Sequence, residues 1–67
     1  MSTIDNRSLE YIRICREQGC IYIGIQTGLM GLEDLVMFNE PGGSTLGIPV
    51  SEFSSISLAR KLEQRRL

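Results

Sequence analysis

Apolar residues recur along the chain with two different periods, and the changes between them divide the sequence into five elements. Helical spacing is found in residues 5–18 and 54–66, and alternation with a period of two in residues 20–26 and 44–50; residues 34–39, which read as a strand between them, contain a continuous apolar run. The resulting order, α-β-β-β-α, predicts an α+β fold. We expect one domain over residues 1–67, a three-stranded, mainly antiparallel sheet with both helices packed on one face.

The first helix has signals at both ends. Asp5 or Asn6 can cap its start by accepting hydrogen bonds from free backbone N–H groups. Gly19 follows the last turn, where a left-handed residue commonly closes a helix. The stripe expected to face the core consists of Leu9, Tyr11, Ile12 and Cys15.

The second helix carries a stronger start signal. Ser54 is the expected N-cap, with Ser51 as the alternative if the helix begins a turn earlier. Phe53 and Leu58 have the spacing of a hydrophobic staple around Ser54. The core stripe expected here consists of Leu58 and Leu62, with Ile56 and Ala59 beside it.

The first and third strands each suggest a buried face. The isoleucines of the first strand are expected to pack on the helices, and Gly24 marks a bulge or a close backbone approach.

Pro49 cannot donate a ladder hydrogen bond, so the third strand is expected at an edge of the sheet. A tight turn at residues 40–43 joins it to the second strand as an antiparallel hairpin. The isoleucines are Ile21, Ile23 and Ile25, and Leu46, Ile48 and Val50 share one face of the third strand.

The second strand is apolar on both faces, and this predicts association. Leu35 and Met37 fall on one side, and Val36 and Phe38 on the other. A chain of 67 residues has too little mass to cover both faces of a sheet, so we expect one face, or a strand edge, to bind a second copy or another protein. That surface is predicted to carry Tyr22 together with Leu35 and Met37.

The connection at residues 27–33 is unusually apolar. It contains Leu29, Met30 and Leu32 between two glycines. Two interpretations stay open: the loop folds back onto the core, or it forms an exposed contact patch in which Met30 belongs to the interface.

Composition argues against most catalytic chemistry. The chain has no His, so no Ser-His or Cys-His pair can form, and two cysteines cannot complete a structural zinc site. We therefore expect no catalytic residues, no metal and no cofactor. Cys15 and Cys20 are expected to be free, buried thiols. No stretch resembles a signal peptide or a membrane span, which makes the cytoplasm the expected location.

Two features suggest a ligand instead. Backbone N–H groups and hydroxyls at Gly42, Gly43 and Ser44 can hold a small anion or nucleotide, although the turn lacks a P-loop pattern. Four basic residues crowd the C-terminal helix and suggest contact with nucleic acid or an acidic partner, against a net charge of −1 for the chain. These residues are Arg60, Lys61, Arg65 and Arg66.

The sequence resembles no family by any motif, so the functional prediction rests on association. We expect a small, non-enzymatic protein–protein interaction module that acts as a homodimer or higher oligomer. Its size suggests a regulatory or mobile-element accessory protein that blocks a partner's surface. The alternatives are a nucleic-acid-binding regulator and a binder of small anions.

Overall fold

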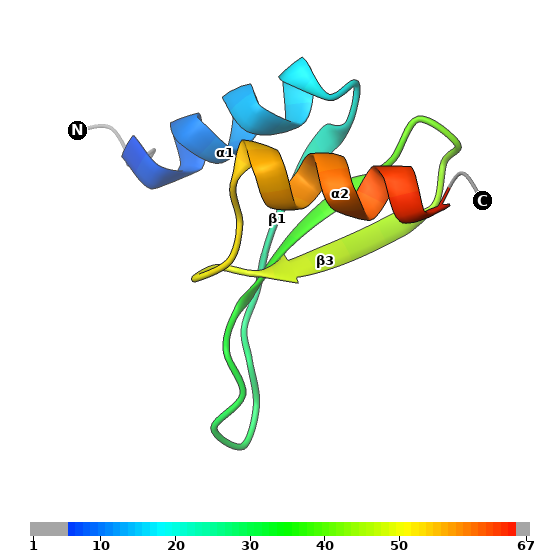
Figure 1. Cartoon of the computed structure of the whole chain (residues 1–67). Coiled ribbons are helices and arrows are strands. Elements are labelled where there is room, and N and C mark those ends of the chain that lie inside the picture. The colour runs from blue at the N-terminus through cyan, green and yellow to red at the C-terminus, as the bar shows by residue number, and fades with distance from the viewer. Residues whose placement is uncertain (1–5, 66–67) are drawn as a thin grey trace.

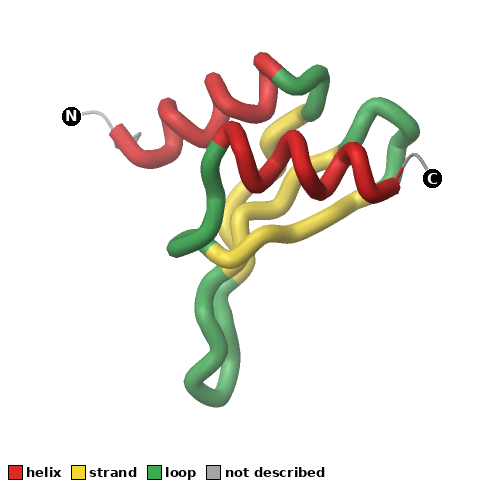
Figure 2. Tube along the Cα trace, in the orientation of Figure 1, coloured by secondary structure: helices red, strands yellow, loops and turns green. Residues whose placement is uncertain are grey.

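The computed structural model of the chain, which describes residues 6–65, contains five elements in the predicted order (Figure 1). They are α1 (Asn6–Glu17), β1 (Ile21–Gln26), β2 (Leu35–Asn39), β3 (Thr45–Pro49) and α2 (Ser55–Arg65). The strands form one antiparallel sheet in the order β1-β2-β3. Both helices lie on the same side of this sheet, so the predicted α+β architecture is confirmed (Figure 2).

The strand register assigns every sheet residue to a face. Tyr22 lies opposite Phe38, and Phe38 lies opposite Leu46, so these three side chains share the face that the helices cover. The second row on this inner face is Ile25, Val36 and Ile48. Val36, Phe38 and Ile48 are buried, as the split of β2 into two apolar sides predicts.

A β-bulge in β1 overturns the prediction that the isoleucines form one buried face. The register shifts between Tyr22 and Gly24, so Ile23 and Gly24 together oppose Met37. Ile21 and Ile23 therefore lie on the outer face, 67% and 53% exposed. Beyond the bulge Ile25 returns to the inner face, at the exposed end of the strand.

The prediction that Tyr22 lies on the uncovered face is also wrong. It is half-buried against the core, and its ring centroid lies 6.2 Å from that of Tyr11. Tyr11 in turn meets Phe53 edge to face at 5.1 Å, and Phe53 lies 6.2 Å from Phe38. The four aromatic residues of the chain thus form one continuous cluster inside the fold.

Helix α1 is rotated relative to the predicted stripe. Tyr11, Ile14 and Cys15 are buried, whereas Leu9 is 48% exposed, so the inclusion of Leu9 in the stripe was wrong. The physical reason is the contact of the Tyr11 ring with Tyr22 and Phe53, which places the Tyr11 side of the helix against the core. The predicted N-cap, Asp5 or Asn6, lies outside the side chains that the structure describes.

The C-terminus of α1 closes as the glycine predicts. Gly19 has a φ of 79°, and its N–H donates to the Arg16 carbonyl at 3.1 Å, while the Cys20 N–H donates to the Cys15 carbonyl at 2.8 Å. This pair of bonds is a Schellman motif, in which the residues at the positions of Cys15 and Cys20 characteristically make an apolar contact. Both cysteines are free and buried, as predicted.

The start of α2 is held by two serines. The Ser54 hydroxyl accepts a bond from the Ser57 N–H at 3.1 Å, and the Ser57 hydroxyl accepts one from the Ser54 N–H at 2.9 Å. This is a reciprocal capping box with serine in the place of glutamate. Phe53 and Leu58 are both buried, as a hydrophobic staple requires, but Ile56 is 67% exposed and does not belong to the core stripe.

We predict that Ser54→Ala lowers the free energy of unfolding by about 1 kcal/mol, because an N–H of the first turn loses its acceptor. Ser55→Ala, one position further along the helix, is the matched control and should change stability by less than about 0.5 kcal/mol. Urea unfolding followed by circular dichroism measures both. Equal effects of the two substitutions would contradict the assignment of Ser54 as the cap.

Candidate interaction surface

The outer face of the sheet has no layer packed on it within residues 6–65 (Figures 1 and 2). Its central row is Gly24, Met37 and Gly47, and its upper and lower rows are built in the same way from one residue of each strand. None of the described residues in these rows is charged. The row at one end of the outer face is Ile21, Asn39 and Thr45, and the row at the other end is Gln26, Leu35 and Pro49; Ile23 from the bulge also lies on this face.

Glycine in β3 lets two of the predicted interface residues lie flat on this face. A Cβ atom on Gly47 would lie 2.8 Å from the Met37 sulfur and 3.4 Å from a methyl carbon of Leu35. The two side chains therefore extend over the Gly47 backbone and remain half-exposed. The sequence placed Leu35 and Met37 on one face correctly, but it missed Ile21 and Ile23, which the bulge turns outward.

The connection at residues 27–34 projects from the sheet as an extended loop, here called the finger (Figure 2). Leu29, Met30 and Leu32 are 71%, 99% and 75% exposed. This excludes the interpretation in which the loop folds back onto the core. Of the two alternatives, the exposed apolar patch is the one that the structure has.

Three backbone features give the finger a defined shape. The Leu32 N–H donates to the Leu29 carbonyl at 3.0 Å, closing a tight turn at the tip. At the root the Gly28 N–H donates to the Asp34 carboxylate at 2.8 Å. A Cβ atom on Gly28 would lie 2.1 Å from the Leu32 carbonyl oxygen, so only glycine permits the two arms to approach this closely.

Glu33 and Asp34, the only adjacent pair of acids in the sequence, point to different partners. Both Glu33 oxygens accept bonds from the Ser51 hydroxyl, at 2.7 and 2.9 Å, whereas Asp34 binds Gly28. Their carboxylates close loops and do not converge on a common ligand. Within residues 6–65, no group of three or more acidic or cysteine side chains is arranged to hold a metal ion.

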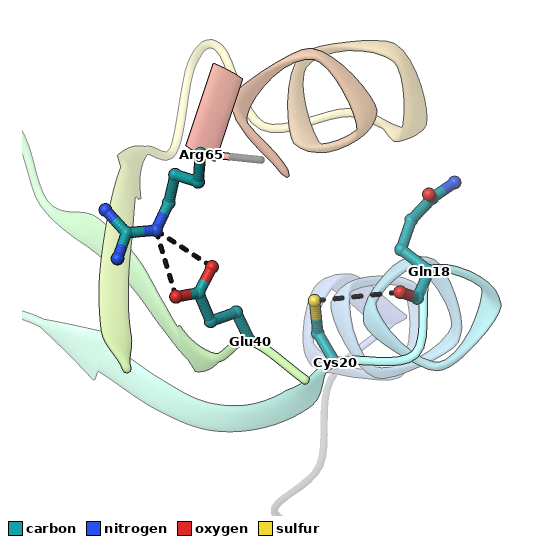
Figure 3. A network of polar contacts seen from close by, with 4 residues as sticks. All are labelled: Gln18, Cys20, Glu40 and Arg65. Carbon is teal, nitrogen blue, oxygen red and sulfur yellow. Dashed lines mark hydrogen bonds and ion pairs between the residues drawn. The ribbon is translucent and has the colours of Figure 1, made fainter. Parts of the chain in front are cut away.

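The predicted anion site and the basic helix meet at one ion pair (Figure 3). The Arg65 Nε donates to both oxygens of Glu40 at 2.9 Å, and Glu40 begins the turn that contains Gly42 and Gly43. The structure thus places a carboxylate between the turn and the arginine. A negative charge at this point opposes the binding of an anion by the same groups.

The remaining predicted contacts are dispersed. Gly42, Gly43 and Ser44 are exposed in the turn, while Arg60 is exposed and Lys61 half-buried on α2. Arg66 lies outside the described residues. A nucleic-acid contact by these residues stays a prediction, with Arg65 already engaged by Glu40.

The cysteines have the character of core residues. Burial raises the pKa of the Cys15 thiol to about 11, and the neighbouring Cys20 contributes to the rise. Burial also raises the pKa of Cys20, with a further contribution from the negative charge of Glu40. Both thiols are therefore protonated at neutral pH, which makes them poor nucleophiles.

Comparisons with known proteins identify no relative of this chain. No family model, no curated protein and no solved structure matches the chain. Among residues 6–65, no helix has the length and apolar character needed to cross a membrane.

The Glu40–Arg65 pair predicts a loss of stability in acid. Its hydrogen bond to Arg65 lowers the pKa of Glu40 in the folded protein. The stabilisation is therefore complete above the unfolded pKa of about 4.3 and is lost as the pH falls through the lower folded value. Urea midpoints at pH 7 and pH 3 should differ more for the unsubstituted protein than for Arg65→Gln.

Arg60→Gln is the matched control for this measurement, because it removes the same charge from the same helix at an exposed position that forms no ion pair within residues 6–65. It should retain the pH dependence of the unsubstituted protein. The same acid dependence in all three proteins would show that the Glu40–Arg65 pair contributes nothing.

Proposed function

We propose that the protein is a non-enzymatic interaction module that works as a homodimer, pairing through the outer face of its sheet. The observation that carries this proposal is the uncovered, uncharged outer face, which continues into the apolar finger. Depletion of charge is a mark of the centre of protein interfaces. Isolated apolar side chains on a surface are ordinary, but a contiguous patch of them is typical of a contact site.

The amount of exposed apolar surface is in the range that a stable dimer needs. Five large side chains on the outer face and the finger are between 53% and 99% exposed. Together they offer on the order of 400 Å² of apolar area. One half of a standard interface buries about 800 Å², of which somewhat more than half is apolar. The five residues are Ile21, Ile23, Leu29, Met30 and Leu32.

A second copy suits this face better than a partner of strong charge. A two-fold axis brings residues near their own copies, so any charge close to the axis would meet the same charge. The outer face has no charge to repel. A domain of this size also gains from added burial, because its own core buries a limited share of its surface.

We predict that Ile21→Glu converts the dimer into monomers, because a carboxylate on the paired face loses its hydration without gaining a partner. Ile56→Glu is the matched control. Ile56 has the same exposure of 67% but lies on α2, on the other side of the molecule. Native mass spectrometry and sedimentation velocity should show a dimer for the unsubstituted protein and for Ile56→Glu.

Circular dichroism must show that both variants are folded. A monomeric unsubstituted protein would refute the proposal, as would equal dissociation by the two variants. Bound nucleotide or nucleic acid in the mass spectrum would favour the alternative of a nucleic-acid or anion binder.

A further inference from the structure

A groove opens at one end of the outer face, where the sheet meets the finger. Its volume is about 440 Å³, more than one aliphatic side chain needs. On the finger side the groove is lined by Leu29 and Leu32, and on the sheet side by the whole end row of Gln26, Leu35 and Pro49. The groove is therefore continuous with the face that the helices leave uncovered.

The opposite end of the same face carries a projecting aliphatic side chain. Ile21 begins β1 and Gln26 ends it, so roughly 15 Å of strand separates Ile21 from the groove. Ile21 is 67% exposed. The row between the two ends is low, because Gly24 has no side chain and Met37 lies over the Gly47 backbone. The outer face thus has a knob at one end, a groove at the other and a flat centre.

We infer that the two outer faces pair about a two-fold axis that crosses the strands at their centre, with Ile21 of each copy in the groove of the second copy. Such an axis lies between the two sheets, reverses the strand direction and brings opposite ends of the two faces together. It gives two equal contacts of knob and groove and closes the assembly after two copies. This inference rests on the proposed dimer and specifies how its copies engage.

The direction of the finger fits this axis. The finger projects from the end of the sheet away from both helices, toward the side on which the second copy lies (Figures 1 and 2). With the strands reversed, the two fingers stand at opposite ends of the dimer, and each covers the Ile21 end of the second copy while the flat centres of the two sheets remain in contact. With the strands parallel, both fingers would meet at one end, and neither Ile21 would reach a groove.

The distribution of acids also favours reversed strands. Glu33 and Glu52 line the groove, and Asp34 closes the root of the finger. Reversed strands place these carboxylates against the neutral end row that contains Ile21. Parallel strands would bring the carboxylates of both copies together at one end, where their repulsion opposes pairing.

Cross-linking of two singly substituted proteins tests this arrangement. Ile21→Cys places a thiol on the knob, and Gln26→Cys places one in the groove. The two variants are produced in the same cells, so that mixed dimers form, and are treated with a short bis-maleimide. We expect cross-linked dimers that contain one copy of each variant, identified by mass.

Ile56→Cys produced together with Gln26→Cys is the matched control. Ile56 is as exposed as Ile21 but lies on α2, so this pair should give no cross-link. Cys15 and Cys20 should not react in any of these proteins, because both are buried and protonated. Equal cross-linking of the two pairs would overturn the inference.

The other possible results separate this inference from the proposed function. Cross-links between two copies of Gln26→Cys would place both grooves at one end, which overturns the reversed strands and leaves the dimer standing. A native dimer with no cross-link between Ile21→Cys and Gln26→Cys would have the same meaning. A monomeric unsubstituted protein would overturn the proposed function and the inference together.

Two substitutions in the finger test the groove without changing the sheet. Leu29 lines the groove, whereas Met30 lies at the tip and does not line it. The two side chains are 71% and 99% exposed in the single chain, so Leu29→Ser and Met30→Ser should leave the unfolding midpoint of the dilute monomer unchanged.

The dimer should distinguish the two variants. Leu29→Ser should raise its dissociation constant roughly 10-fold or more, because both grooves lose an apolar contact with Ile21. Met30→Ser should change the constant by less than about threefold. Equal constants for the two variants, measured by sedimentation equilibrium, would refute the groove as the site that receives Ile21.

Discussion

The cluster of four aromatic rings is the contact on which the other packing depends. Tyr11 of α1 lies between Tyr22 of β1 and Phe53, and Phe53 reaches Phe38 of the central strand. Phe53 also belongs to the staple that starts α2, so one ring links the beginning of a helix to the covered face of the sheet. The cluster therefore joins both helices to β1 and β2 through side chains that are contiguous in space and distant in sequence.

Because all four aromatic rings lie on one side of the sheet, the side chains on the other side are of different types. The outer face has only aliphatic, small and neutral polar side chains, with Met37 and Leu35 lying over the Gly47 backbone. Within residues 6–65 no further element covers them. The aromatic side chains are all used in the core on one face, so exposed aliphatic side chains are left on the other. This exposed apolar surface is the physical basis for expecting association.

The sequence predicted the features whose signals are local. Gly19, Ser54 and Pro49 each mark an end or an edge by their own chemistry, and the structure confirms all three. The predictions that were wrong concern features that are set by contacts between residues far apart in the sequence. One extra residue at the bulge reverses the faces of β1, and the Tyr11 ring rotates α1 away from Leu9. The Glu40–Arg65 pair spans 25 residues and has no local signal, and the exposed Met30 was recognised as one of two open alternatives.

The edges of the sheet explain why association should use a face. β1 and β3 are the two edge strands, and unpaired backbone groups at an edge invite another strand. The bulge at Ile23 and Gly24 interrupts the regular edge of β1, and Pro49 removes a donor from β3. Both edges are thus poor templates for a continuous sheet between two copies. What remains accessible is the uncharged outer face with the finger beside it. These two surfaces are adjacent because Leu35 and Pro49 of the outer face line the same groove as Leu29 and Leu32 of the finger.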